Sequence, residues 1–251
     1  ISGSDSDQER ALASFLALGL WRNSPDTARQ HSTALLPIAY MGRYDVDQGA
    51  RSASSNWKEV WSEGAPSSDA GLRMYAQEIT TICIHRLATS SQYSVKRSAA
   101  AALGAMAAAH NSSVGSSSLS MAAEALVNAL PGHIWDGKDA ALGALGTIGS
   151  TITNPSCGVD ISVWRLIGGA GVVVSALLKE CLRGKKEYRL CAMEALTFIL
   201  EGCRDTGDFI SILTPVLSPE WDSASIDGNS ESLQDVARTV QATGSDAEAV
   251  D

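Results

Sequence analysis

The sequence predicts an all-α fold, an α-solenoid of about five HEAT-like helical hairpins followed by a disordered acidic C-terminal tail. The main observation is a recurring pattern in which a basic residue leads into small and large apolar residues at helical spacing. Trp57, Leu103, Leu145 and Leu196 hold the same place in four copies, at steps of 46, 42 and 51 residues. These steps are close to the ~40 to 47 residues of HEAT and armadillo repeats.

Two further observations support a stack of helices. Almost no segment alternates polar and apolar residues with a period of two, and 45% of residues are hydrophobic while 19% are charged. A single helical hairpin cannot bury its apolar face alone, so neighbouring hairpins stack and share a core. The four copies of the pattern are Arg51/Ala53/Trp57/Val60, Arg97/Ala99/Leu103/Met106, Lys138/Ala141/Leu145/Ile148 and Arg189/Ala192/Leu196/Ile199.

The organisation expected from these copies is a flexible start over residues 1–7, one solenoid over 8–221 and a tail over 222–251. The five approximate repeats within the solenoid are 8–42, 47–88, 94–130, 135–183 and 185–218.

The first two hairpins are predicted from apolar periodicity and from their turns. Helices are expected over 8–20 and 25–41 in the first, with Pro37 kinking the second of these. In the second hairpin, a turn of Glu-Gly-Ala-Pro at 63–66 joins helices over 47–62 and 68–88.

The third hairpin is predicted as helices over 94–110 and 119–130, ended by the Pro131-Gly132 stop signal. The fourth begins near Trp135 and its first helix runs to about residue 151. The fifth pairs 185–203 with a short helix over 209–217.

The longest uncharged apolar run covers residues 166–178 and contains three glycines. It is shorter than the ~20 residues that a membrane-spanning helix needs. We therefore expect a buried solenoid helix there and no membrane insertion. The chain starts with Ile1, followed by a polar acidic stretch, which predicts a fragment of a longer protein.

The five cysteines form no tight pattern, which favours reduced thiols and a cytoplasmic or nuclear location. The net charge is −9, and residues 222–251 hold seven carboxylates against one arginine, so the body before them is nearly neutral. A tail rich in Ser, Asp, Glu and Gly favours disorder. A nucleic-acid surface is not expected, because it would need many clustered Lys and Arg residues.

One basic cluster stands out, between the fourth and fifth repeats. Its members are Lys179, Arg183, Lys185, Lys186 and Arg189. Two interpretations stay open: a solvated inter-repeat turn with cations at a helix C-terminus, or a docking patch for an acidic partner. These five residues are the candidate partner-binding site.

Motifs for catalysis are incomplete throughout the sequence. Residues 132–138 match the GxxxxGK spacing of a phosphate loop, but Asp139 replaces the Ser or Thr that would bind magnesium. The Gly169-Ala170-Gly171 segment lacks the third glycine of a dinucleotide fingerprint. The cysteines and the four histidines show no zinc spacing. We therefore predict no enzyme, no cofactor and no metal site.

The pair Trp57 and Trp61 lies at i, i+4 on one predicted helix. Core packing is the expected role, and an exposed aromatic anchor for a partner is the alternative.

Several phrases resemble a known family. They are LPGHIWDGKDAALGALGTI, LLKECLRGKKEYRLCAMEAL, LLPIAYMGRYDVDQGARSASSNWKEVWSE and RMYAQEITTI. Together they resemble the C-terminal region of the large HEAT-repeat adaptor and scaffold proteins of the 26S proteasome. The most specific part is the motif LPG-x-x-W-x-GK at 130–138, with the KEC and KEY pieces at 179–181 and 186–188. The Gly-rich segment 153–174 and the tail depart from that pattern.

The resemblance implies a non-enzymatic scaffold that binds proteasome subunits, holds the core and regulatory particles together, and takes part in assembly quality control and localisation. It assigns no residue of this chain to the contact. A generic HEAT-repeat scaffold of the transport-receptor or phosphatase-scaffold type would share the same physical features, and it stays open as the alternative.

Overall fold

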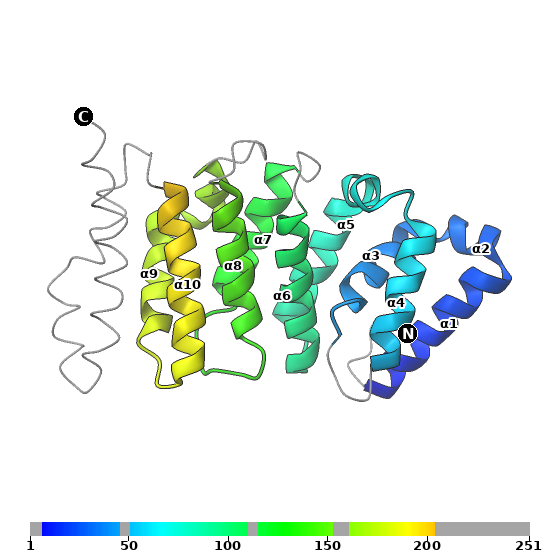
Figure 1. The fold of residues 1–251 in the computed structure, drawn as a ribbon, viewed down its shortest axis with the longest axis horizontal. Helices are drawn as coiled ribbons and strands as arrows, with labels where there is room; N and C mark the ends of the chain where they lie inside the picture. Colours follow the sequence, from blue (N-terminus) through cyan, green and yellow to red (C-terminus); the bar gives the residue numbers. More distant parts are fainter. Residues whose placement is uncertain (1–6, 46–50, 110–114, 153–160, 204–251) are drawn as a thin grey trace, which may run out of the picture.

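The computed structural model describes residues 7–45, 51–109, 115–152 and 161–203, and within these ranges it holds helices and no strand (Figure 1). The helices are α1 (Asp7–Asn23), α2 (Pro25–Gln30), α3 (Ser32–Gly42), α4 (Arg51–Gly64), α5 (Ser68–Thr89), α6 (Tyr93–Ala108), α7 (Ser116–Asn128), α8 (Asp139–Ile152), the 3-10 helix η3 (Ile161–Ile167), α9 (Ala170–Cys181) and α10 (Lys186–Cys203). The predicted all-α solenoid is confirmed.

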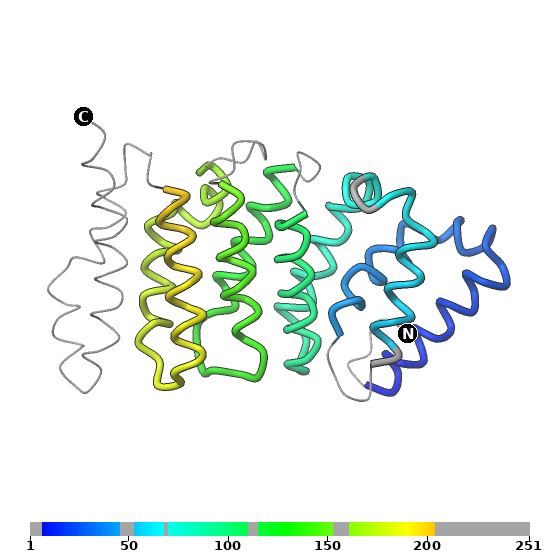
Figure 2. The backbone as a smooth tube through the Cα atoms, in the orientation of Figure 1, coloured from blue at the N-terminus to red at the C-terminus, as the bar shows by residue number. Residues whose placement is uncertain are grey.

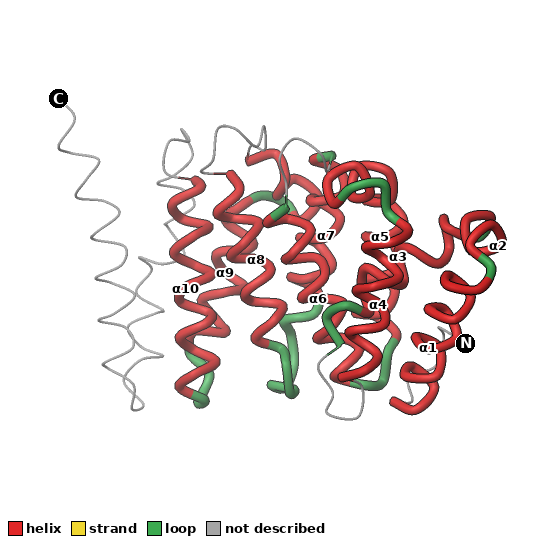
Figure 3. Tube along the Cα trace, turned by 45° about the vertical axis from the view of Figure 1, so that its right-hand side comes forward, coloured by secondary structure: helices red, strands yellow, loops and turns green. Residues whose placement is uncertain are grey.

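The helices form two layers along a single row (Figures 1 and 2). In one layer α8 packs between α6 and α10, and in the other α5 packs between α3 and α7. Successive helices run up and down, so the turns that join one hairpin to the next lie along one edge, as the loops in Figure 3 show. The turns ending at Tyr93, Asp139 and Lys186 are therefore neighbours on that edge.

One apolar core runs through the stack from α1 to α10. The repeated pattern supplies it: Leu103, Leu145 and Leu196 are at most 2% exposed. Trp57 and Trp61 are 5% and 4% exposed, which confirms their core role.

The segment predicted as one helix over 25–41 forms two helices, α2 and α3, because the helix is interrupted at His31. The His31 N–H bonds back to the Ala28 carbonyl at 3.1 Å, while the His31 carbonyl accepts from the N–H groups of Ala34 and Leu35. One helix therefore ends and another begins at the same residue. α3 continues through Pro37, so the break does not lie at the proline.

Two other boundaries differ from the prediction. The helix expected from Trp135 begins only at Asp139, because the residues before it form a turn. The helix expected over 166–178 is interrupted at Gly168 and Gly169, whose φ angles are +93° and +107°. This left-handed region is open to glycine at little cost, so η3 ends there and the buried helix α9 begins.

The remaining described helices match their predicted ranges to within a few residues, as with α5 and α10. The predicted helices over 209–217, the tail over 222–251 and the start over 1–6 lie outside the described residues. The division into five repeats stays a prediction.

Within the described ranges, no single helix has both the length and the hydropathy of a membrane span. Among the described residues, one pair of helices, η3 and α9, has the length and hydropathy of a membrane span when taken together, and the pair is bent by 74°.

Close packing of α8 against α10 depends on Gly149. A Cβ atom there would lie 2.8 Å from Ile199 Cγ1 and 3.0 Å from the Ile199 backbone nitrogen, whereas one at Gly143, on the same helix, would meet nothing within 4 Å. We expect Gly149→Ala to lower the free energy of unfolding by about 1–3 kcal/mol. Gly143→Ala, the matched control, should raise it by roughly 0.5–1 kcal/mol through helix propensity. Urea unfolding measures both, and a stable Gly149→Ala would contradict the close approach.

Candidate functional site

The turn between α7 and α8 and the turn between α9 and α10 lie side by side at one edge of the solenoid (Figures 1 and 2). Arg183 joins them, because its Nη2 donates to the Gly132 carbonyl at 2.7 Å. The first of these turns contains most of the motif LPG-x-x-W-x-GK, and the KEC and KEY pieces flank the second.

Glu180, next to the end of α9, is the centre of a hydrogen-bond network beneath these turns. Its Oε2 accepts from Lys138 Nζ at 3.2 Å and from the Tyr188 hydroxyl at 2.7 Å. Arg183 donates to the same carboxylate through Nη2 at 3.0 Å and through Nε at 3.3 Å. Lys138 Nζ also lies 5.7 Å from the centre of the Tyr188 ring. Residues from three segments thus converge on one carboxylate.

The two charges at the centre of this network are buried, so each depends on its partners. The side chains of Lys138 and Glu180 are 0% and 3% exposed, and a buried charge is tolerated only when it is paired and hydrogen-bonded. Burial lowers the pKa of Lys138, and its bond to Glu180 offsets part of that effect. Burial by itself would raise the pKa of Glu180, but the bonds from Arg183, Tyr188 and Lys138 outweigh it and lower the pKa below its usual range.

The motif LPG-x-x-W-x-GK acquires a physical role at each of its later positions. Trp135 is buried and stacks on Tyr93, with ring centroids 5.6 Å apart. Gly137 has φ of +90°, and a Cβ there would lie 2.5 Å from Arg97 Cδ. Lys138 reaches Glu180. The motif therefore forms a turn that anchors one hairpin to the next. This agrees with the sequence analysis, in which Asp139 argues against a phosphate loop.

The predicted basic cluster divides into two groups. Arg183 and Arg189 are half-buried and belong to the turn, with Arg189 Nη1 donating to the Arg183 carbonyl at 3.4 Å. Lys179, Lys185 and Lys186 are exposed and make no ion pair with any described residue. The structure places all five around one turn and leaves their role as a binding patch a prediction.

Sequence reasoning missed the members of the buried network. From the sequence, Lys138 belongs to the repeated pattern, to the family motif and to a failed phosphate loop, and Glu180 and Tyr188 belong to short family phrases, but none of the three has a predicted partner. A signal was present, since GK, KEC and KEY each combine a charged residue with segments otherwise built for a core.

Three of the described cysteines, Cys83, Cys181 and Cys203, are buried, and Cys191 is half-buried. Burial raises the pKa of Cys181 to about 12, with the neighbouring Glu180 adding to the effect, and raises the pKa of Cys203 to about 11. Thiols with such values are poor nucleophiles. No group of three His, Cys, Asp or Glu residues in the described ranges could hold a metal ion.

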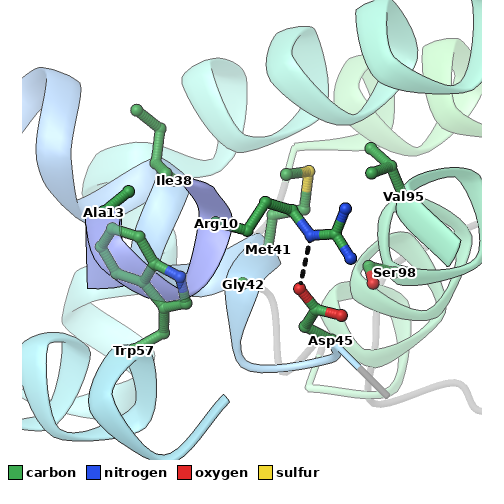
Figure 4. A pocket seen from close by; sticks show the side chains of 9 residues that line it. All are labelled: Arg10, Ala13, Ile38, Met41, Gly42, Asp45, Trp57, Val95 and Ser98. Carbon is green, nitrogen blue, oxygen red and sulfur yellow. Dashed lines mark hydrogen bonds and ion pairs between the residues drawn. The ribbon is translucent and has the colours of Figure 1, made fainter. Parts of the chain in front are cut away.

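A small cavity lies at the other end of the solenoid, where α1, α3, α4 and α6 meet (Figure 4). Its volume is about 40 Å³, and Arg10 crosses it to donate from Nε to Asp45 Oδ2 at 2.8 Å. This space suits water rather than a substrate, for which sites of roughly 300–1,000 Å³ are usual.

Comparison with known proteins tests the family resemblance. No family model matches the chain. The human proteasome adapter and scaffold protein ECM29 is 29% identical to it over 201 residues, which are 78% of this chain and 11% of that protein. This chain is a distant relative of ECM29. The family resemblance expected from the turn motif is thereby confirmed.

ECM29 is much longer, so the chain corresponds to a small part of it. An engineered protein of known crystal structure also aligns, at 15% identity and a TM-score of 0.45, over 90% of this chain and 97% of that one.

Removing either partner of the buried ion pair should have unequal effects. Glu180→Leu leaves the Lys138 ammonium buried without an acceptor, so we expect a loss of about 3–5 kcal/mol in the free energy of unfolding. Lys138→Met leaves Glu180 bonded to Arg183 and Tyr188, so the loss should be about 1–3 kcal/mol. Urea unfolding measures both, with Lys58→Met at an exposed position as the control. Equal losses would contradict the central place of Glu180.

The pH dependence of stability should reveal Glu180 directly. Because its pKa is lowered in the folded state, its contribution is complete above the unfolded value of about 4.3 and is lost as pH falls through the folded value. The stability difference between wild type and Glu180→Gln should therefore shrink as pH falls below about 4. Glu194→Gln, at an exposed position, should follow wild type throughout. A difference that stays constant with pH would contradict the assignment.

Proposed function

We propose that this chain is a non-enzymatic scaffold segment that binds the 26S proteasome and helps to hold its core and regulatory particles together. The observation that carries the proposal is the similarity to ECM29, a proteasome adapter and scaffold protein, over 78% of the chain. Roles in assembly quality control and a location in cytoplasm and nucleus belong to the same proposal.

The architecture suits such work. Stacked hairpins with one continuous core form a semi-rigid spacer. The buried Glu180 network fixes the last two hairpins relative to one another, because its members come from both. The exposed Lys179 near the end of α9, Lys185 on the turn and Lys186 at the start of α10 then surround a turn of defined geometry, where they can dock an acidic surface of a proteasome subunit.

Affinity capture from cells expressing the tagged chain, followed by mass spectrometry, tests the proposal. We expect core and regulatory subunits of the proteasome to be enriched over a tag-only control. Capture of transport or phosphatase subunits in their place would instead favour the generic scaffold.

The docking role of the basic turn has its own variant. Lys185→Glu with Lys186→Glu should reduce the captured proteasome several-fold, because like charge at an interface opposes an acidic partner. Lys58→Glu, a charge reversal at an exposed position on α4, should leave capture unchanged. If the double variant captures as much proteasome as wild type, another surface makes the contact.

A further inference from the structure

An exposed aromatic side chain lies at the same edge as the basic turn. Tyr93, the first residue of α6, is 41% exposed although it is large and apolar. Its ring stacks on the buried Trp135 at an interplanar angle of 15°. Its hydroxyl shares a hydrogen bond of 2.8 Å with His133 Nε2. The ring is therefore held in place by two neighbours while much of its surface stays accessible.

A chain of contacts links this ring to the cations. His133 follows Gly132, and the Gly132 carbonyl accepts from Arg183 Nη2. Arg183 lies on the turn between α9 and α10, which also contains Lys185 and leads into Lys186, the first residue of α10. We name the surface formed by Tyr93, His133, Arg183, Lys185 and Lys186 the turn edge. The turns that lead into α8 and α10 lie along the lower side of Figure 1.

The turn edge is anchored to the buried Glu180 through Arg183 and carries the exposed cations Lys185 and Lys186. Arg183 is held by Glu180, which is itself buried. The lysines have no described carboxylate as a partner. Around the two turns, three exposed lysines, Lys179, Lys185 and Lys186, and the half-buried Arg183 and Arg189 face three exposed carboxylates, Asp136, Asp139 and Glu187. Arg183 and Tyr93 are already held by their neighbours, so ordering these two side chains on binding costs little conformational entropy.

We propose that the turn edge binds an acidic segment of a partner protein that carries an aromatic side chain among its carboxylates. The lysines and the exposed part of Arg183 would pair with the carboxylates, and Tyr93 would pack against the aromatic ring. Tyrosine and arginine are the residue types that dominate binding energy at protein interfaces. The inference rests on the proposed scaffold function and names the chemistry of one contact.

Charge argues for a protein segment rather than a nucleic acid. Binding along a phosphate backbone requires many cations spread over a long surface, whereas the turn edge has a few on adjacent turns. The chain as a whole carries a net charge of −9, which repels a long polyanion. A short acidic segment meets only the local positive charge.

The test uses the purified full chain and a fluorescein-labelled synthetic acidic peptide with one central phenylalanine. A second peptide has serine in place of the phenylalanine. By fluorescence anisotropy at low salt we expect the first peptide to bind about tenfold more tightly than the second. Lys185→Glu with Lys186→Glu should weaken both peptides about tenfold, while the matched control Lys58→Glu should bind as wild type does.

Variants at Tyr93 separate recognition from folding. Tyr93→Ala should abolish the preference for phenylalanine, and Tyr93→Phe, which keeps the ring, should retain it. Lys185→Arg with Lys186→Arg should retain binding, and circular dichroism checks that each variant is helical.

Three results would overturn the inference: no binding of either peptide, equal binding of the two peptides, or binding of a single-stranded oligonucleotide of equal charge at least as tightly as the phenylalanine peptide. None of these bears on whether proteasomes are captured from cells. Conversely, failure to capture proteasomes with intact peptide preference would reject the proposed function and leave the turn edge standing.

Discussion

The buried carboxylate of Glu180 is the constraint on which the last two hairpins depend. A buried ion pair adds little stability compared with well-packed apolar residues, but it is costly to break. Lys138 and Glu180 therefore add little net stability, but they constrain how the neighbouring helices are placed relative to one another. The observed placement of α8, α9 and α10 gives both charges their partners, and a shift that separated Lys138 from Glu180 would leave a buried charge without its partner.

This constraint links the interior of the solenoid to its surface. Arg183 donates to the buried carboxylate and also to the Gly132 carbonyl on the neighbouring turn. The guanidinium of Arg183 therefore links both turns to the buried carboxylate, while 34% of its side chain stays exposed. A scaffold needs surface groups at fixed distances from one another, and a turn anchored through its own core residues provides them without enlarging the domain.

The N-terminal hairpins are held by different means. Arg43 lies 4.5 Å from the centre of the Tyr40 ring and 5.9 Å from that of Trp61, while Arg10 bridges to Asp45 beside the small cavity. Cations there pack against aromatic faces or bond to a carboxylate at a helix junction. The hairpins therefore share one kind of apolar core, but the polar contacts between neighbouring helices differ from one hairpin to the next.

The sequence by itself determined the helical stack, because the apolar residues around Leu103, Leu145 and Leu196 recur at helical spacing within each copy, which is a local property of amphipathic helices. All three leucines are buried in the structure. It also located the basic turn and the family motif. Tertiary structure decided the rest. The buried pairing of Lys138 with Glu180 and the contact of Tyr93 with His133 both depend on atoms brought together by folding. Residues 42 or 40 positions apart in the chain leave no periodic signal of such contacts, so only the packed hairpins reveal them.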